Sequence, residues 1–121
     1  MDTVKTYDRH GYSEYARIFD SDTSKCWDRK REYNVMFIKA MQNYANDLLR
    51  YKGMVYLNQV YEMLGLKITD PELRVGWKLD AVDGDNYVDF GLHDIDRYLY
   101  WEEWDGILLD FNVDSILPEI D

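Results

Sequence analysis

Four aspartates are close enough in the sequence to form a cation site: Asp80, Asp83, Asp85 and Asp89, all within DAVDGDNYVDF, residues 80–90. Hard divalent cations prefer clustered carboxylate oxygens. An EF-hand loop would need a glycine at its sixth position and a glutamate at its twelfth, and this stretch has neither. Two interpretations remain: a non-standard metal site, which would suit a divalent-metal-dependent hydrolase, or a solvated β-hairpin.

The register of that hairpin separates the two interpretations. A four-residue loop would put Asp80 opposite Asp89, a repulsive pair unless a cation bridges it. A two-residue loop at Asp83-Gly84 would put Lys78 opposite Asp89 instead. Electrostatics favours the shorter loop by less than about 1 kcal/mol. Hydrophobic patterning does not choose, because both registers keep the same side chains on the inner face.

The sequence contains no recognised motif for nucleophilic catalysis, zinc binding or nucleotide binding. Cys26 has no histidine partner in a recognised motif, because His10 and His93 are both remote from it in the chain. One cysteine and two distant histidines also exclude zinc-finger spacing. Neither a phosphate-binding loop nor a dinucleotide-binding fingerprint is present. We therefore predict no catalytic residues, no cofactor and no enzymatic activity.

A segment rich in aromatic and acidic residues, 93–106, is the stronger candidate for function. Aromatic side chains beside charges are typical of recognition surfaces. The alternative is that the rings fold back onto the core. The predicted partner-binding residues are the anchors Tyr98, Tyr100, Trp101 and Trp104 and the steering charges Asp94, Asp96, Glu102, Glu103 and Asp105.

Composition and charge set the wider limits. The 121 residues predict a single domain, in which residues 1–30 are weakly patterned. No run of apolar residues suits a membrane helix or a signal peptide, and a lone cysteine is typical of a reducing cell interior. Residues 1–53 carry 10 Lys/Arg against 8 Asp/Glu (+2), whereas residues 54–121 carry 4 against 16 (−12). The acidic half argues against direct nucleic-acid binding and favours a protein partner with a basic surface.

Two helices are predicted ahead of the aspartates. The first spans Arg31 to Lys52 and ends at Gly53, a residue suited to a left-handed cap. The second is short, from Gln59 to Leu64, with Asn58 as its N-cap and Gly65 as its end. The long helix has one polar stripe, formed by Lys39, Asn43, Asn46 and Arg50. Its apolar side has Val35, Ile38, Met41, Ala45 and Leu48, widened by Phe37, Tyr44 and Tyr51.

Alternating apolar residues then predict three strands, at 74–82, 87–92 and 107–113. The first two form the hairpin around Asp83-Gly84. Residues 13–19 suit either a short helix or a strand. The predicted fold is α+β, with two N-terminal helices packed on a three-stranded antiparallel meander sheet.

Three blocks, NYANDLLRYKGMVYLNQVYEMLGL, VGWKLDAVDGDNYVDFGL and ILLDFNVD, resemble an uncharacterised family of small proteins from phages and prophages of gut Firmicutes. The resemblance covers roughly residues 32–117. It implies a phage-type protein in the cytoplasm of the host cell and carries over no catalytic residue.

Together these features predict a small acidic protein that acts by protein–protein interaction. An inhibitor of a host defence protein or a nucleic-acid-binding protein would fit them. The alternative is a phage structural or assembly component, which would form a homo-oligomer through its sheet edge or its aromatic loop.

Overall fold

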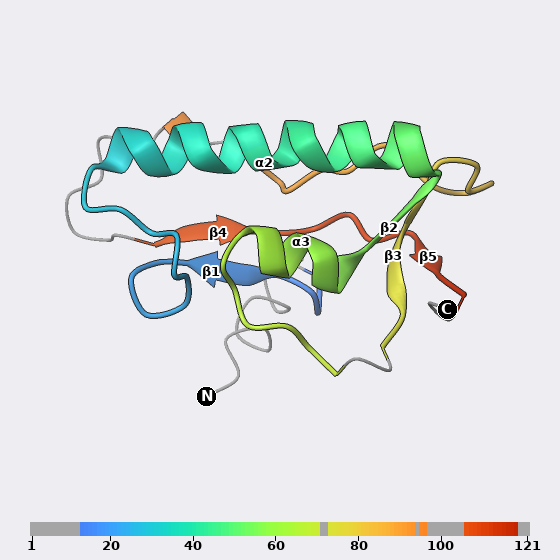
Figure 1. Cartoon of the computed structure of the whole chain (residues 1–121), viewed down its shortest axis with the longest axis horizontal. Helices are drawn as coiled ribbons and strands as arrows, with labels where there is room; N and C mark the ends of the chain where they lie inside the picture. Colours follow the sequence, from blue (N-terminus) through green and yellow to red (C-terminus); the bar gives the residue numbers. More distant parts are fainter. Residues whose placement is uncertain (1–12, 71–72, 94, 97–105, 119–121) are drawn as a thin grey trace.

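The computed structural model describes residues 13–70, 73–93, 95–96 and 106–118 (Figure 1). These residues form an α+β structure. Its elements in chain order are β1 (Arg17–Phe19), α2 (Arg31–Lys52), β2 (Met54–Tyr56), α3 (Leu57–Met63), β3 (Val75–Lys78), β4 (Ile107–Leu109) and β5 (Ser115–Ile116).

The strands make two small antiparallel sheets, and the predicted single three-stranded meander is wrong. β1 pairs with β4, and Ile18 lies opposite Leu108. The second sheet has the order β2-β3-β5, with Val55 opposite Trp77 and Gly76 opposite Ser115. Segments far apart in the sequence therefore pair. The two helices are also not both N-terminal, because β1 precedes α2 and β2 separates α2 from α3.

Helix α2 has the predicted bounds. Its end is fixed by Gly53, which adopts the left-handed conformation (φ 84°) and donates its N–H to the carbonyl of Leu49. A β-carbon at this position would meet no atom within 4 Å, so the positive φ alone is the reason for a glycine.

Helix α3 exists but begins earlier than predicted. It starts at Leu57, because the Gln59 side chain turns back and accepts the N–H of Tyr56 at 2.9 Å. Asn58 is consequently inside the helix and is not its N-cap. Its side-chain oxygen instead accepts hydrogen bonds from the N–H and the hydroxyl of Thr69, both at 2.9 Å. Gly65 has a positive φ of 72° just after the helix, as a terminating glycine should.

The predicted hairpin between 74–82 and 87–92 does not form. β3 ends at Lys78, and both of its edges are taken, one by β2 and the other by β5. Neither proposed register occurs, so Asp89 faces neither Asp80 nor Lys78. The hairpin does not form because β2 and β5 occupy the edges of β3 in the folded structure, and a local sequence pattern contains no signal for such remote pairing.

Residues 88–90 are held by side chains and not by a neighbouring strand of the predicted hairpin. Asn46 of α2 accepts the N–H of Val88 at 2.7 Å and donates to its carbonyl at 2.9 Å. Gln42 of α2 accepts the N–H of Phe90 at 2.8 Å. On the other edge, Asp110 donates its N–H to the carbonyl of Phe90 at 3.0 Å. Val88 and Phe90 are buried, as the alternation predicted.

Aromatic rings fill the core between the helices and the β1–β4 sheet. Phe111 meets Tyr61 and Phe90 edge to face, with ring centroids 5.5 Å and 5.2 Å away. Phe19 and Trp77 are also fully buried. The same cluster includes residues of the β1–β4 sheet, Phe19 and Leu109, and of the other sheet, Val55 and Trp77. One core therefore joins both sheets.

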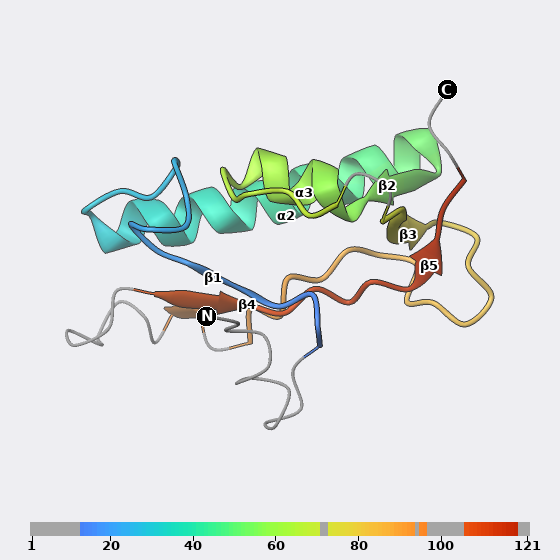
Figure 2. The same cartoon turned by 90° about the horizontal axis from the view of Figure 1, so that it is seen from below.

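Figure 2 shows the resulting layers: α2 and α3 lie on one side, and β1 with β4 on the other. The β1–β4 sheet covers only the side of α2 that faces it. Among the described residues, no helix is both long and apolar enough to cross a membrane.

Candidate interaction surface

A row of exposed apolar side chains runs along α2. Its intervals of three, eight and seven residues are close to whole numbers of 3.6-residue turns, so its members lie on one side of the helix. At a rise of 1.5 Å per residue the row is about 27 Å long. We call it the α2 stripe, and it comprises Tyr33, Met36, Tyr44 and Tyr51.

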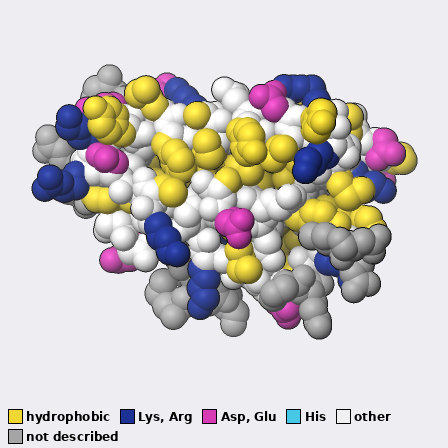
Figure 3. Space-filling view, viewed as in Figure 1, with side chains coloured by type: hydrophobic (Ala, Val, Ile, Leu, Met, Phe, Trp, Pro, Cys, Tyr) yellow, Lys and Arg dark blue, Asp and Glu magenta, His cyan; other side chains and the backbone are white. Residues whose placement is uncertain are grey.

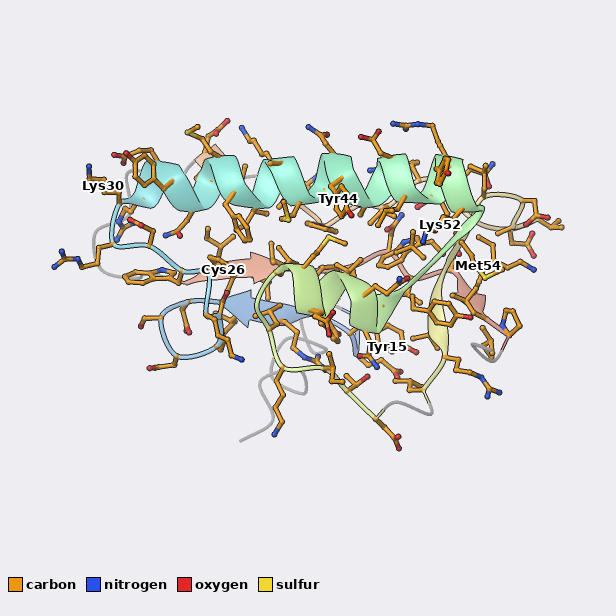
Figure 4. The ribbon with its side chains drawn as sticks, viewed as in Figure 1. Tyr15, Cys26, Lys30, Tyr44, Lys52 and Met54 are labelled. Atoms are coloured by element: carbon orange, nitrogen blue, oxygen red, sulfur yellow. The ribbon has the colours of Figure 1, made fainter. Side chains whose placement is uncertain are left out.

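The stripe reaches solvent because other elements cover a different side of α2. Val35, Ile38, Ala45 and Leu49 are the apolar residues that α2 buries. The prediction that Tyr44 and Tyr51 widen this buried side is wrong: Tyr51 is 85% exposed and Tyr44 50%. Figure 4 places Tyr44 midway along the helix.

Partly buried side chains extend this apolar surface toward α3. Phe37, Met41 and Leu48 of α2, and Met63 of α3, pack against the core while remaining partly accessible. Figure 3 shows the result as a band of hydrophobic side chains across the face that carries the two helices. An apolar band of this kind on a folded domain is a typical feature of a protein-binding face.

Basic side chains accompany the α2 stripe. The Lys30 ammonium lies 5.2 Å from the ring centre of Tyr33, an arrangement that favours a cation–π contact. Near the other end, Arg50 forms an ion pair with Asp47, and Lys52 ends the helix. Residues 25–52 carry seven Lys/Arg against three Asp/Glu, in a chain with a net charge of −10. The helix is thus basic although the protein is acidic.

The loop of residues 79–87 has the opposite charge. It contains three aspartates, and its exposed side chains are Leu79, Asp80, Val82, Asp83, Asp85, Asn86 and Tyr87. Gly84 permits the turn, because a β-carbon there would lie 2.2 Å from Oδ2 of Asp114. Val82 is 96% exposed at the tip. Hydrophobic and acidic groups are therefore presented together.

The four aspartates considered as metal ligands do not gather. Asp85 accepts a hydrogen bond from the Asn112 amide at 2.9 Å, and Asp89 accepts the N–H of Gly91 at 2.8 Å. Asp80 and Asp83 are exposed. In the part of the chain that the structure describes, no three His, Cys, Asp or Glu residues are close enough to hold a metal ion.

Most of the predicted partner-binding segment lies outside the described residues: Asp94, Tyr98, Tyr100, Trp101, Glu102, Glu103, Trp104 and Asp105. Their role stays a prediction. Asp96 is described, and its exposed carboxylate is 3.1 Å from the ammonium of Lys39 on α2. This contact brings the end of the predicted segment beside the long helix.

Buried Tyr61 and half-buried Tyr15 both have raised pKa values, and both pack in the core. Burial raises the pKa of Tyr61, and the Arg17 guanidinium over its ring works in the opposite direction. The Tyr61 hydroxyl donates to the carbonyl of Tyr15 at 2.7 Å. Burial also raises the pKa of Tyr15. Cys26 is an exposed thiol. For the two tyrosines, the contacts observed are packing and hydrogen bonding.

Comparison with known proteins gives one result. A family model described as "Family of unknown function (DUF6353)" matches residues 1–120. The chain belongs to the DUF6353 family. No curated protein and no solved structure matches it. Membership of DUF6353 brings no activity or ligand with it, so function has to be argued from the surfaces described above.

Proposed function

We propose that this protein acts by binding another protein and not by catalysing a reaction. The observation that carries the proposal is the α2 stripe. Tyrosine and methionine are both enriched at protein interfaces, and tyrosine buries a large area while fixing only two side-chain torsions. Tyr44 and Tyr51 contribute aromatic surface to solvent on the side of α2 away from its buried residues Val35, Ile38, Ala45 and Leu49.

The charge of the second half supports a partner with a basic surface. Residues 54–121 carry a balance of −12, and Asp80, Asp83, Asp85 and Asp96 are all exposed. Such charges speed the encounter with an oppositely charged protein. The aromatic and acidic residues of 93–106 remain proposed as further anchors on the same molecule.

We further propose that the protein is encoded by a phage or a prophage. The resemblance of residues 32–117 to phage proteins supports it. In that setting the protein would act inside the host cell as an inhibitor of a defence protein or a nucleic-acid-binding protein, because such targets present the basic surfaces that an acidic protein fits.

A capture experiment tests the proposal. The wild type, Tyr44→Ser/Tyr51→Ser and the control Asn43→Ser are immobilised and exposed to a lysate of the cells that carry the gene. We expect the wild type and the control to retain the same proteins, with the double variant losing them. Capture should weaken in 1 M salt, where the Debye length is about 3 Å. Identical captures by all three proteins would contradict the proposal.

One observation favours the alternative function of a phage structural or assembly component. The end of the molecule that carries the start of α2 is basic, and the end that carries loop 79–87 is acidic. Unlike, complementary ends are what a component that adds copies of itself head to tail requires.

A further inference from the structure

We propose that copies of this chain associate head to tail, with the acidic loop of one copy docked on the basic start of α2 of the next. The occupant of each surface is thus a second copy of the same chain. The proposal comes from the match in charge and in apolar character between two surfaces at opposite ends of the molecule.

The first surface, which we call the basic end, surrounds the start of α2. Its exposed charged residues are Lys25, Arg29 and Lys30 together with the acids Asp28 and Glu32, and its exposed apolar residues are Tyr33 and Met36. Residues 25–32 carry four Lys/Arg against two Asp/Glu, a balance of +2. One of the two acids, Asp28, is already engaged, because its carboxylate accepts the backbone N–H of Lys30 at 2.8 Å. Met36 is 64% exposed and supplies the apolar centre.

The second surface, the acidic end, is the loop of residues 79–87. It carries three Asp and no Lys or Arg, a balance of −3. Leu79, Val82 and Tyr87 supply its apolar groups. Lys52 closes α2 at the same end of the molecule, but the loop extends past the last turn of the helix (Figure 1). The outermost groups on this side are therefore those of the loop.

The two ends face away from each other along the longest axis of the molecule. Figures 1 and 2 both show the start of α2 at one extreme and the loop after β3 at the other. Figure 4 labels Lys30 at the first of these. Within one copy the ends cannot meet, and a contact between unlike surfaces leaves one free end on each side. Such a heterologous contact adds copies in a row.

The contact should be weak and dependent on salt. Each end presents only a few apolar side chains, so the area it buries belongs to the small class of transient interfaces, below about 1,200 Å². The charges are exposed and add mainly to the rate of encounter. We expect an average mass that rises with protein concentration and falls in 1 M salt.

Two variants that each disable one end provide the test. Arg29→Ser/Met36→Ser removes one charge and one apolar group from the basic end, and Val82→Ser/Asp83→Ser does the same at the acidic end. Lys67→Ser/Ile68→Ser is the matched control, because it removes an exposed charge and an exposed apolar group from the α3–β3 connection. Far-UV circular dichroism verifies that all variants fold.

Sedimentation is then measured at concentrations up to about 1 mM, which populate even weak contacts. The wild type and the control should form species beyond the dimer, and each end variant alone should stay monomeric. An equimolar mixture of the two end variants should form a dimer and nothing larger, because only one intact pair of ends exists. A monomeric wild type, or a mixture that stays monomeric or forms longer species, would overturn the proposal.

The proposal shares Tyr33 and Met36 with the α2 stripe, but a separate variant distinguishes it from the function proposed above. Tyr44 and Tyr51 belong to neither end, so Tyr44→Ser/Tyr51→Ser should associate as the wild type does even if it captures no partner. Loss of association in that variant would show that the contact uses the middle of α2 and would contradict the head-to-tail arrangement.

Discussion

Replacement of Asn112 by alanine should destabilise the protein more than its partly exposed position suggests. The Asn112 side-chain oxygen accepts the indole N–H of Trp77 and the backbone N–H of Asp89, both at 2.7 Å. Its amide nitrogen donates to Asp85 at 2.9 Å and to the carbonyl of Tyr87 at 3.0 Å. The Asn112 side chain thus joins Trp77 of β3 to the segment of residues 85–89.

The cost follows from what the alanine leaves behind. The Trp77 ring is fully buried, so its N–H would lose the acceptor that satisfies it, at about 1–3 kcal/mol. The N–H of Asp89 is half-buried and adds about 1 kcal/mol, whereas the two donor contacts face solvent and count for little. The sum is about 2–4 kcal/mol, a large part of the 5–15 kcal/mol that stabilises a typical domain.

Urea unfolding followed by far-UV circular dichroism measures this cost without relying on tryptophan emission. With a slope of about 1–3 kcal/mol/M, a cost of about 2–4 kcal/mol should lower the midpoint of Asn112→Ala by about 0.7–4 M. Asn43→Ala is the control, because Asn43 is exposed on α2 and alanine favours helix there. A midpoint for Asn112→Ala that agrees with the wild type within about 0.3 M would refute the reasoning.

Three further predictions concern stability. Gly76→Ala should cost about 3 kcal/mol or more, or prevent folding, because the new β-carbon would lie 2.0 Å from the Val55 carbonyl oxygen; an unchanged urea midpoint would contradict this. Asn46→Ala should cost about 1–3 kcal/mol, since it removes both hydrogen bonds to the Val88 backbone; hydrogen exchange at that amide should rise in parallel, and unchanged protection would argue against the contact. Burial raises the pKa of Tyr61, so above pH about 10 the unfolded chain releases a proton that the folded chain keeps, and the free energy of unfolding should fall as the pH rises further. Tyr61→Phe should reduce that fall, and an identical pH dependence in wild type and variant would count against it.

Local signals in the sequence predicted local structure well. The bounds of α2 follow from an apolar period of 3.6 residues and from a glycine at the position that needs a positive φ. The inward positions of Val88, Phe90 and Leu109 follow from the two-residue alternation of extended chains. Each of these signals depends only on neighbours within a few residues, which is why a single sequence contains them.

Pairing across the chain could not be predicted in the same way. Two alternating segments that flank an Asp-Gly turn predict a hairpin, yet β3 pairs with β2 and β5. The amides that replace strand pairing, Asn46 and Gln42, look like ordinary polar residues on a helix. Nothing in their spacing shows that they face a backbone segment more than 40 residues away.

The candidate surface was visible in the sequence but was assigned to the wrong environment. Tyr44 and Tyr51 fit the helical period of an apolar face, and a wide apolar face usually means burial. The structure shows that the β1–β4 sheet is small and covers only one side of α2. An apolar helix face that is wider than the sheet available to cover it is the signal that would have identified the α2 stripe.

Photo-crosslinking from the α2 stripe tests the proposed function most directly. A benzophenone amino acid would replace Tyr44, Tyr51 or, as a control outside α2, the exposed Asp22, in the cells where the gene is expressed. We predict that positions 44 and 51 crosslink to a discrete protein other than this chain and that position 22 does not. Crosslinks of equal yield from all three positions, or none from 44 and 51, would contradict a role for the stripe in partner binding.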